Sequence, residues 1–401
     1  MQGIQLSMKG NIAVIGAGIT GITTAYYLAK AGYTVSVYER ESGPAQKTSF
    51  ANGGQISVSN SEVWTTWSNV LKGIKWLGQK DAPLLIRRDT LISDPDRISW
   101  LIKFLYYTAT NSYYHNTVET IRMGLESKLL YNKIMNDEYI KFDYSKSGIL
   151  HFYKDKRYFK AAIKAKDIYE SNSLGWNILE PKQVKSLDPA LEDIDDIIGG
   201  AWTPSDSTGD IYKFCVELEK ILKEKYQVNF YYNHNIEKVL IDGYDRVVVT
   251  GGVGSVKLAQ SIGDDLPIYP VKGYSITINN VDPKYLPKVS LLDDQAKIVT
   301  SSLGNRFRVA GTAELAGENY DIRPDRIEPL LNWVRVNFPK IDIGDYSSWA
   351  CLRPMTPNML PITKKSDKNS KVYYNTGHGH LGWTLAPYTA EKIVNLIQKD
   401  K

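Results

Sequence analysis

A glycine-rich turn near the start of the chain constrains the fold most. The buried-strand pattern Asn11–Ile15 leads directly into Gly16-Ala-Gly18-Ile-Thr-Gly21, a helical pattern follows, and Tyr33–Tyr38 alternates as a second strand. In such a βαβ unit the first glycine permits the tight turn and the second lets a pyrophosphate approach the backbone. The third lets the helix and the strand pack closely. The sequence therefore predicts a dinucleotide-binding fold that starts at this turn.

Two neighbouring features extend the predicted nucleotide site. Ile19 and Thr20 stand in the glycine turn just before the predicted helix, whose free amides and partial positive charge suit phosphate groups. Glu39 ends the second strand, where a carboxylate accepts hydrogen bonds from the adenosine ribose and disfavours a 2′-phosphate. Arg40 follows it and is assigned to the same site. These residues predict dinucleotide binding but do not separate FAD from NAD.

Composition excludes several other classes of function. The formal charge of +5 is spread over 401 residues without a basic tail, which argues against a nucleic-acid partner. The two cysteines form no disulfide framework, which favours a reducing, cytoplasmic compartment. The five histidines show no zinc-binding spacing, so no metal site is expected. No run of 18 apolar residues could span a bilayer.

The predicted fold class is α/β (α+β overall), with a Rossmann-like domain built from discontinuous segments and a mixed-sheet substrate domain with inserted helices. Strand patterns recur at residues 148–153, 197–202, 228–232, 245–252, 274–278, 297–301, 306–310 and 372–375. Helical patterns occupy residues 23–31, 157–172, 211–226, 385–398 and several parts of 63–140. We assign residues 8–60, 207–262 and 346–401 to the dinucleotide-binding domain, and residues 61–206 and 263–345 to the substrate domain.

Five segments resemble a known family, in the same order along the chain. The chain is similar to the FAD-dependent D-amino acid dehydrogenase small subunits, within the wider D-amino acid oxidase-like group. The segments that carry the resemblance are Thr48–Ser57, Pro270–Ser275, Asn305–Glu314, Leu352–Pro357 and Asn375–Thr384. The resemblance implies that the cofactor is FAD and not NAD. It also implies that the FAD is held without a covalent bond.

The same resemblance implies roles for individual residues. Arg353 would bind the substrate carboxylate through two parallel hydrogen bonds, and the hydroxyl of Tyr274 would face the substrate. Amides at the start of the last helix would stabilise negative charge on the flavin. The implied FAD contacts are Thr48, Ser49, Asn52, Gly53, Gln55, Ile236, Gly377, Gly379, His380, Leu381, Gly382, Trp383 and Thr384.

The implied reaction is the oxidative deamination of a small D-amino acid, with a hydride passing from the α-carbon to flavin N5. The electrons would continue to a quinone or another respiratory-chain acceptor. Oxidation of glycine, sarcosine, proline or an opine remains an alternative, as does a protein that binds FAD without catalysis. Three departures bear on turnover: the family's hairpin after Ile241 is missing, Thr356-Pro-Asn-Met359 lacks the usual glycine, and the chain stops soon after its last helix.

Two local features have more than one interpretation. Cys351 lies two residues before Arg353, where the related sarcosine oxidases carry a flavin-linked cysteine, yet the closer resemblance favours a buried thiol and a non-covalent FAD. The aromatic helix Trp100–Tyr107 fits a core helix of the substrate domain. It also fits peripheral contact with the cytoplasmic face of the inner membrane.

Overall fold

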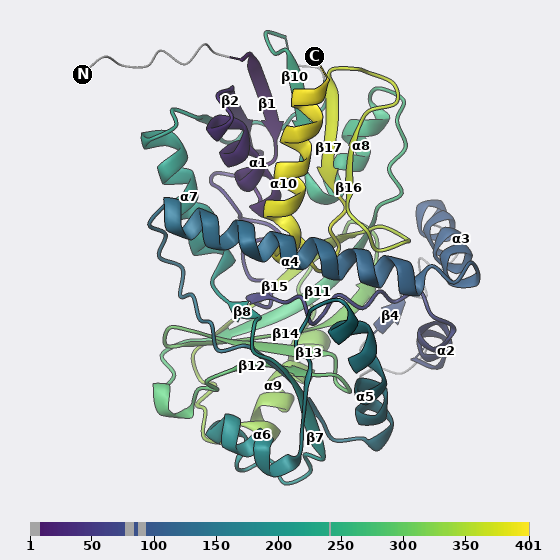
Figure 1. Cartoon of the computed structure of the whole chain (residues 1–401), viewed down its shortest axis with the longest axis vertical. Coiled ribbons are helices and arrows are strands. Elements are labelled where there is room, and N and C mark those ends of the chain that lie inside the picture. Colours follow the sequence, from purple (N-terminus) through teal and green to yellow (C-terminus); the bar gives the residue numbers. More distant parts are fainter. Residues whose placement is uncertain (1–8, 77–83, 87–93, 240–241, 401) are drawn as a thin grey trace.

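The computed structural model describes residues 9–76, 84–86, 94–239 and 242–400. These residues form two large sheets, one of six strands and one of nine. In Figure 1 the six-stranded sheet occupies the upper half of the molecule and the nine-stranded sheet the lower half. The long helix α4 (Tyr113–Asp137) crosses the molecule where the two halves meet.

The six-stranded sheet has the strand order β16-β17-β10-β1-β2-β9, and all of its neighbours are parallel except β16 and β17. Its strands are β1 (Asn11–Ile15), β2 (Thr34–Tyr38), β9 (Asn229–Tyr231), β10 (Arg246–Val249), β16 (Ile362–Lys365) and β17 (Val372–Thr376). One face is covered by α1 (Ile19–Lys30), α7 (Ile211–Glu224) and α10 (Gly382–Lys399), and the other by α8 (Ser255–Gln260). A parallel sheet covered on both faces is the arrangement that the βαβ pattern predicts.

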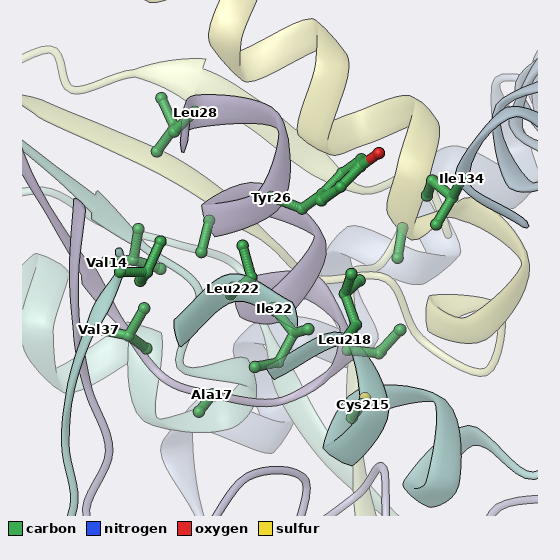
Figure 2. Packing of buried hydrophobic residues seen from close by; sticks show 14 of the residues in the cluster. Val14, Ala17, Ile22, Tyr26, Leu28, Val37, Ile134, Cys215, Leu218 and Leu222 are labelled. Atoms are coloured by element: carbon green, nitrogen blue, oxygen red, sulfur yellow. The ribbon is translucent and has the colours of Figure 1, made fainter. Parts of the chain in front are cut away.

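Alternation along β1 explains how both faces are buried. Val14 points toward α1 and α7, whereas its neighbours Ala13 and Ile15 point toward α8. Figure 2 shows Val14 close to Ile22 of α1 and Leu222 of α7, with Cys215 and Ile134 in the same cluster. Each fully buried aliphatic side chain contributes about 1.5–3 kcal/mol.

The nine-stranded sheet is mixed, with the order β15-β11-β14-β13-β12-β5-β7-β6 and β4 paired to β14. Its strands are β4 (Leu84–Ile86), β5 (Ile149–Tyr153), β6 (Asn177–Leu179), β7 (Gly199–Thr203), β11 (Tyr269–Ile278), β12 (Ser290–Asp293), β13 (Ile298–Leu303), β14 (Arg306–Leu315) and β15 (Tyr346–Met355). The other elements are α2 (Trp67–Trp76), α3 (Pro95–Ala109), α5 (Lys156–Ser171), α6 (Pro181–Leu187), α9 (Pro324–Asn337), three short 3-10 helices (Pro189–Leu191, Gly252–Gly254, Pro283–Tyr285) and the pair β3 (Gln55–Ile56) and β8 (Ser207–Thr208).

The structure differs from the sequence analysis at several boundaries. α1 begins at Ile19, four residues before the predicted helix, because Gly18 is already its N-cap. Residues 346–355, which were grouped with the dinucleotide-binding domain, form β15 and pair with β11 over ten residues. Alternation indicates a strand but not the sheet to which it belongs.

Two regions bear on the expected departures and on the membrane. Residues 240–241 lie outside the described residues, and Gly243 then turns the chain directly into β10 without a hairpin. Within the described ranges, no helix combines the length and the apolar character that a membrane span requires.

Candidate active site

A cavity of about 1580 Å³ connects the β1–α1 turn with the nine-stranded sheet. Every residue that the sequence analysis assigned to the site lines this cavity, except Gly21 and Gly377. Sites for single small ligands usually measure about 300–1,000 Å³, so this cavity is large enough for a dinucleotide and a second molecule. Tyr38, Tyr320 and the turn Thr250–Gly254 also line it, although the sequence analysis did not assign them to the site.

Main-chain geometry forms the nucleotide end of the cavity. Gly16 has a φ of 106°, which L side chains rarely adopt. A Cβ on Gly21 would lie 1.8 Å from the carbonyl oxygen of Gly16, so helix and turn meet in this way only at a glycine. Gly18 caps α1 without a side chain, and the Ile19 amide donates to Ser49 Oγ at 3.1 Å. The start of the helix therefore faces the cavity with little side-chain cover.

Glu39 is fixed at the end of β2 by two backbone amides. Its Oε2 accepts a hydrogen bond from the Ala17 amide at 2.7 Å, and its Oε1 accepts one from the Glu41 amide at 3.0 Å. Both bonds hold the carboxylate at the cavity wall beside the glycine turn. This is the position that a ribose-binding carboxylate requires in a dinucleotide fold.

The loop of residues 48–55 follows the six-stranded sheet in sequence but is fastened to the other sheet. Thr48 Oγ1 donates to the Leu352 carbonyl at 2.8 Å, and Gln55 Nε2 donates to the Leu291 carbonyl at 3.2 Å. Three loop carbonyls accept hydrogen bonds in turn: Ala51 from Ser275, Asn52 from Arg308 and Gly53 from Ser301. The loop thus lines the middle of the cavity with both of its ends held.

Arg353 lies over a glycine on the neighbouring strand. A Cβ on Gly273 would come within 2.3 Å of Arg353 Nη2, so the guanidinium occupies the space that a side chain there would fill. Arg353 Nη1 donates to the Thr312 carbonyl at 3.0 Å. Within the part of the chain that the structure describes, no carboxylate pairs with Arg353. Desolvation lowers the pKa of Arg353, because no carboxylate among the described residues offsets the loss of water around its charge.

Tyr274 also lines the cavity, but its hydroxyl donates to Glu314 at 2.5 Å. The same carboxylate lies 3.5 Å from Lys272 Nζ and 3.2 Å from Arg323 Nη1, and both Lys272 and Glu314 are fully buried. Burial and Glu314 together raise the pKa of Tyr274. This network links β11 to β14 next to Gly273, so it fixes the part of β11 over which Arg353 lies. The sequence analysis did not find Glu314, which is 40 residues away from Tyr274 in the chain.

The stretch before α10 supplies the opposite wall. His380 stacks on Trp64 with ring centroids 5.0 Å apart and lies 3.3 Å from the Asn60 carbonyl. His378 Nε2 lies 2.9 Å from Thr389 Oγ1. Burial lowers the pKa of each histidine to about 4, so both are neutral near pH 7. α10 starts at Gly382, three residues before the predicted helix, and directs its positive end at the cavity.

The cavity fits FAD in shape and in chemistry. Glycines form the phosphate end, Glu39 stands at the ribose position, and amides with a helix end face the far side. Cys351 lies in the wall near Arg353, and burial raises the pKa of its thiol although Arg353 and Arg308 act in the opposite direction. The thiol is therefore protonated and a poor nucleophile toward a bound ring.

Known proteins resemble this chain along nearly its whole length. It is 44% identical to D-amino acid dehydrogenase 3 of Mesorhizobium japonicum, with 97% of each chain covered. It is 35% identical to the D-amino acid dehydrogenase of Dechloromonas aromatica, with 96% of each covered. Among solved structures, glycine oxidase from Geobacillus kaustophilus has the same fold, with a TM-score of 0.77 at 14% identity over 98% of this chain and 96% of that one.

A family model adds the decisive match, because it spans both sheets and the cavity between them. The model describes FAD-dependent oxidoreductases of the DAO family, and it matches residues 11–396. The matched range includes the glycine turn, the loop after β2, Arg353 and the start of α10. The chain therefore belongs to the DAO family of FAD-dependent oxidoreductases, and FAD is its cofactor.

Proposed function

We propose that the chain is an FAD-dependent dehydrogenase that oxidatively deaminates small D-amino acids. The observation that carries the proposal is the half-buried guanidinium of Arg353, which faces the FAD cavity without a carboxylate partner among the described residues. A substrate carboxylate would supply that partner. The names of the relatives, which are 44% and 35% identical over nearly their full length, support the same reaction.

Each residue at this end of the cavity has a positioning task in the proposal. Arg353 binds the carboxylate and so fixes the α-carbon, while Gly273 leaves room for the guanidinium. The Thr312 carbonyl holds one N–H of the fork in place. FAD, when bound, supplies the hydride acceptor. His380, whose pKa burial lowers to about 4, is too weak a base to take a proton from an ammonium group near pH 7, so no general base is assigned and the substrate amine enters the reaction uncharged.

We also propose that electrons leave to a quinone or another respiratory-chain acceptor, on the cytoplasmic face of the inner membrane. α3 packs Trp100 against the core, while its opposite side exposes Ile98, Ile102, Leu105 and Tyr106. The face with Trp100 suits a core helix, whereas the exposed face opposite would suit contact with a membrane. An exposed apolar face beside a cavity that reaches Phe104 and Leu105 supports contact with a lipid surface.

Flavin bleaching tests the proposal. The purified yellow protein is mixed anaerobically with D-alanine, D-proline, L-alanine, glycine and sarcosine, and absorbance near 450 nm is followed. Bleaching by the D-amino acids, followed by reoxidation with a quinone analogue, is the expected result. A flavin that stays oxidised with the whole panel would leave only an FAD-binding role. Rapid peroxide formation in air, with no increase in rate from added quinone, would show that the protein is an oxidase and not a dehydrogenase.

A second experiment tests how FAD is held. Acid precipitation should release the yellow colour into the supernatant, since the proposed attachment is non-covalent.

A further inference from the structure

The cavity extends beyond Arg353 to charged residues that the proposed reaction does not use. We call these residues the charged cluster; they come from the loop after β3, from α2, from β5 and from the turn between β12 and β13. All of them line the same cavity as Arg353. The charged cluster consists of Glu62, Lys72, His151, Asp294 and Lys297.

Strand register places this cluster one strand beyond the carboxylate site. Arg353 Nη1 binds the carbonyl of Thr312 on β14, and Ile298 on β13 pairs with Gly311, so Lys297 stands next to Thr312. Neighbouring strands lie about 4.8 Å apart. An amino acid whose carboxylate binds Arg353 can therefore extend a long side chain along the cavity toward Lys297 and the rest of the cluster, whereas the methyl of alanine is shorter than one strand spacing.

Most of the cluster's charges are already satisfied. Asp294 Oδ1 lies 2.5 Å from Lys297 Nζ. Although burial acts against it, Lys297 and His151 hold the pKa of Asp294 well below its usual range, so the pair is ionised. His151 Nε2 lies 3.2 Å from Ser59 Oγ, and its Nδ1 lies 3.7 Å from Asp294. The ammonium of Lys72, the fifth member, lies over the ring of Tyr158 at 4.8 Å.

Glu62 differs from the rest of the cluster. Its carboxylate accepts a hydrogen bond from the Tyr113 hydroxyl at 2.9 Å, and no cation of the described residues lies within ion-pair distance of it. Its side chain is exposed to the cavity, although the surrounding protein atoms desolvate the carboxyl group enough to raise its pKa. A carboxylate in these surroundings gains a strong partner when a cationic ligand arrives.

We propose that the charged cluster is the side-chain subsite, and that Glu62 there binds the cationic end of an elongated D-amino acid of the lysine, ornithine or arginine class. The inference rests on the proposed function. We expect the subsite to bind a cation and not an anion, because Lys297 is already paired with Asp294 and Lys72 already lies over the ring of Tyr158. The aromatic wall of Tyr113, Tyr158 and Trp176 suits the apolar stem and the charge of such a side chain.

The test compares long side chains that differ in the charge at their end, in the flavin-containing protein. Anaerobic stopped-flow bleaching gives the dissociation constant and the reduction rate for D-lysine, D-norleucine and D-glutamate. We expect the ratio of the reduction rate to the dissociation constant to be at least about tenfold higher for D-lysine than for D-norleucine, mainly through tighter binding. In Glu62→Gln the lysine-to-norleucine ratio should fall by about 10- to 100-fold, because the charge-assisted bond is lost.

Glu192→Gln is the matched control, since Glu192 is exposed and remote from the cavity; its ratio should equal that of the wild type. An equal or lower preference for D-lysine in the wild type would overturn the subsite, and so would a preference for D-glutamate or an unchanged ratio in Glu62→Gln. Bleaching by D-alanine or D-norleucine in those cases leaves the proposed function standing. No bleaching by any D-amino acid would remove both. Should Glu62→Gln fail to fold, the wild-type panel decides alone.

Discussion

The two ends of the cavity are built in different ways. At the nucleotide end the main chain shapes the wall through Gly16, Gly18 and Gly21 within six consecutive residues, with Glu39 beside the turn. At the substrate end the wall consists of side chains from several strands, with Arg353 on β15 over Gly273 on β11. A local motif therefore encodes the first end, whereas only the folded sheet assembles the second. Substitutions should separate the two ends, since changes in the glycine turn act on FAD, whereas changes at or beside Arg353 act on the substrate.

The largest effect is expected from Gly21→Ala. The new Cβ would lie 1.8 Å from the Gly16 carbonyl oxygen and 2.8 Å from Thr250 Oγ1, so α1 must move away from the turn. We expect FAD to be lost and the fold to be destabilised by about 3 kcal/mol or more. Flavin content and urea unfolding measure this. Gly175→Ala, where a Cβ meets no atom within 4 Å, serves as the control. Full flavin content in Gly21→Ala would contradict the main-chain account.

Arg353→Lys should affect only the substrate end. A lysine keeps the charge but loses the planar fork, and removing such a buried charge-assisted contact costs about 2–5 kcal/mol. We expect substrate affinity, measured by anaerobic flavin bleaching, to fall by a factor of about 30 or more while flavin content stays at the wild-type level. An unchanged KM for the best D-amino acid would show that the carboxylate binds elsewhere.

Gly273→Ala tests whether a glycine can act at the substrate end as well. The new Cβ would lie 2.3 Å from Arg353 Nη2, so the guanidinium must shift although Arg353 itself is unchanged. We expect substrate affinity to fall by about 10- to 100-fold, corresponding to about 1–3 kcal/mol of overpacking. The measurement is again bleaching at varied substrate concentration. Loss of FAD instead of substrate affinity would break the division between the two ends.

The smallest effect concerns His378, which lies where the two ends meet at the start of α10. Burial lowers the pKa of this histidine to about 4, below the value of about 6.5 in an unfolded chain. The unfolded chain therefore binds the extra proton first, and stability present above pH 6.5 is lost as the pH falls toward 4. His378→Asn should reduce the loss of unfolding free energy between pH 7.5 and pH 5 by about 1–2 kcal/mol. Equal losses in both proteins, measured by urea unfolding, would assign the pH dependence to other groups.

The sequence predicted the parts of the molecule that are encoded locally. The βαβ unit, most strands and the position of Glu39 in the cavity follow from short patterns, because each depends on neighbours within a few residues, whereas Arg353 was assigned only through the family resemblance. Glu314 and Glu62 were not predicted. Their partners, Tyr274 and Tyr113, lie 40 and 51 residues away in the chain, and only strand pairing or helix packing brings them together. The assignment of residues 346–355 failed for the same reason, since sheet membership is a long-range property.

The loop of residues 48–55 has a consequence for how the enzyme exchanges its small ligands. Thr48, Gln55 and three loop carbonyls are bonded to the nine-stranded sheet, whereas Ser49 accepts a hydrogen bond from the Ile19 amide of α1. The loop thus joins the two halves of the molecule, and we expect amino acid and product to move through small local displacements, which occur on shorter timescales than domain opening. Product release should therefore be insensitive to solvent viscosity relative to an enzyme that opens as a hinge.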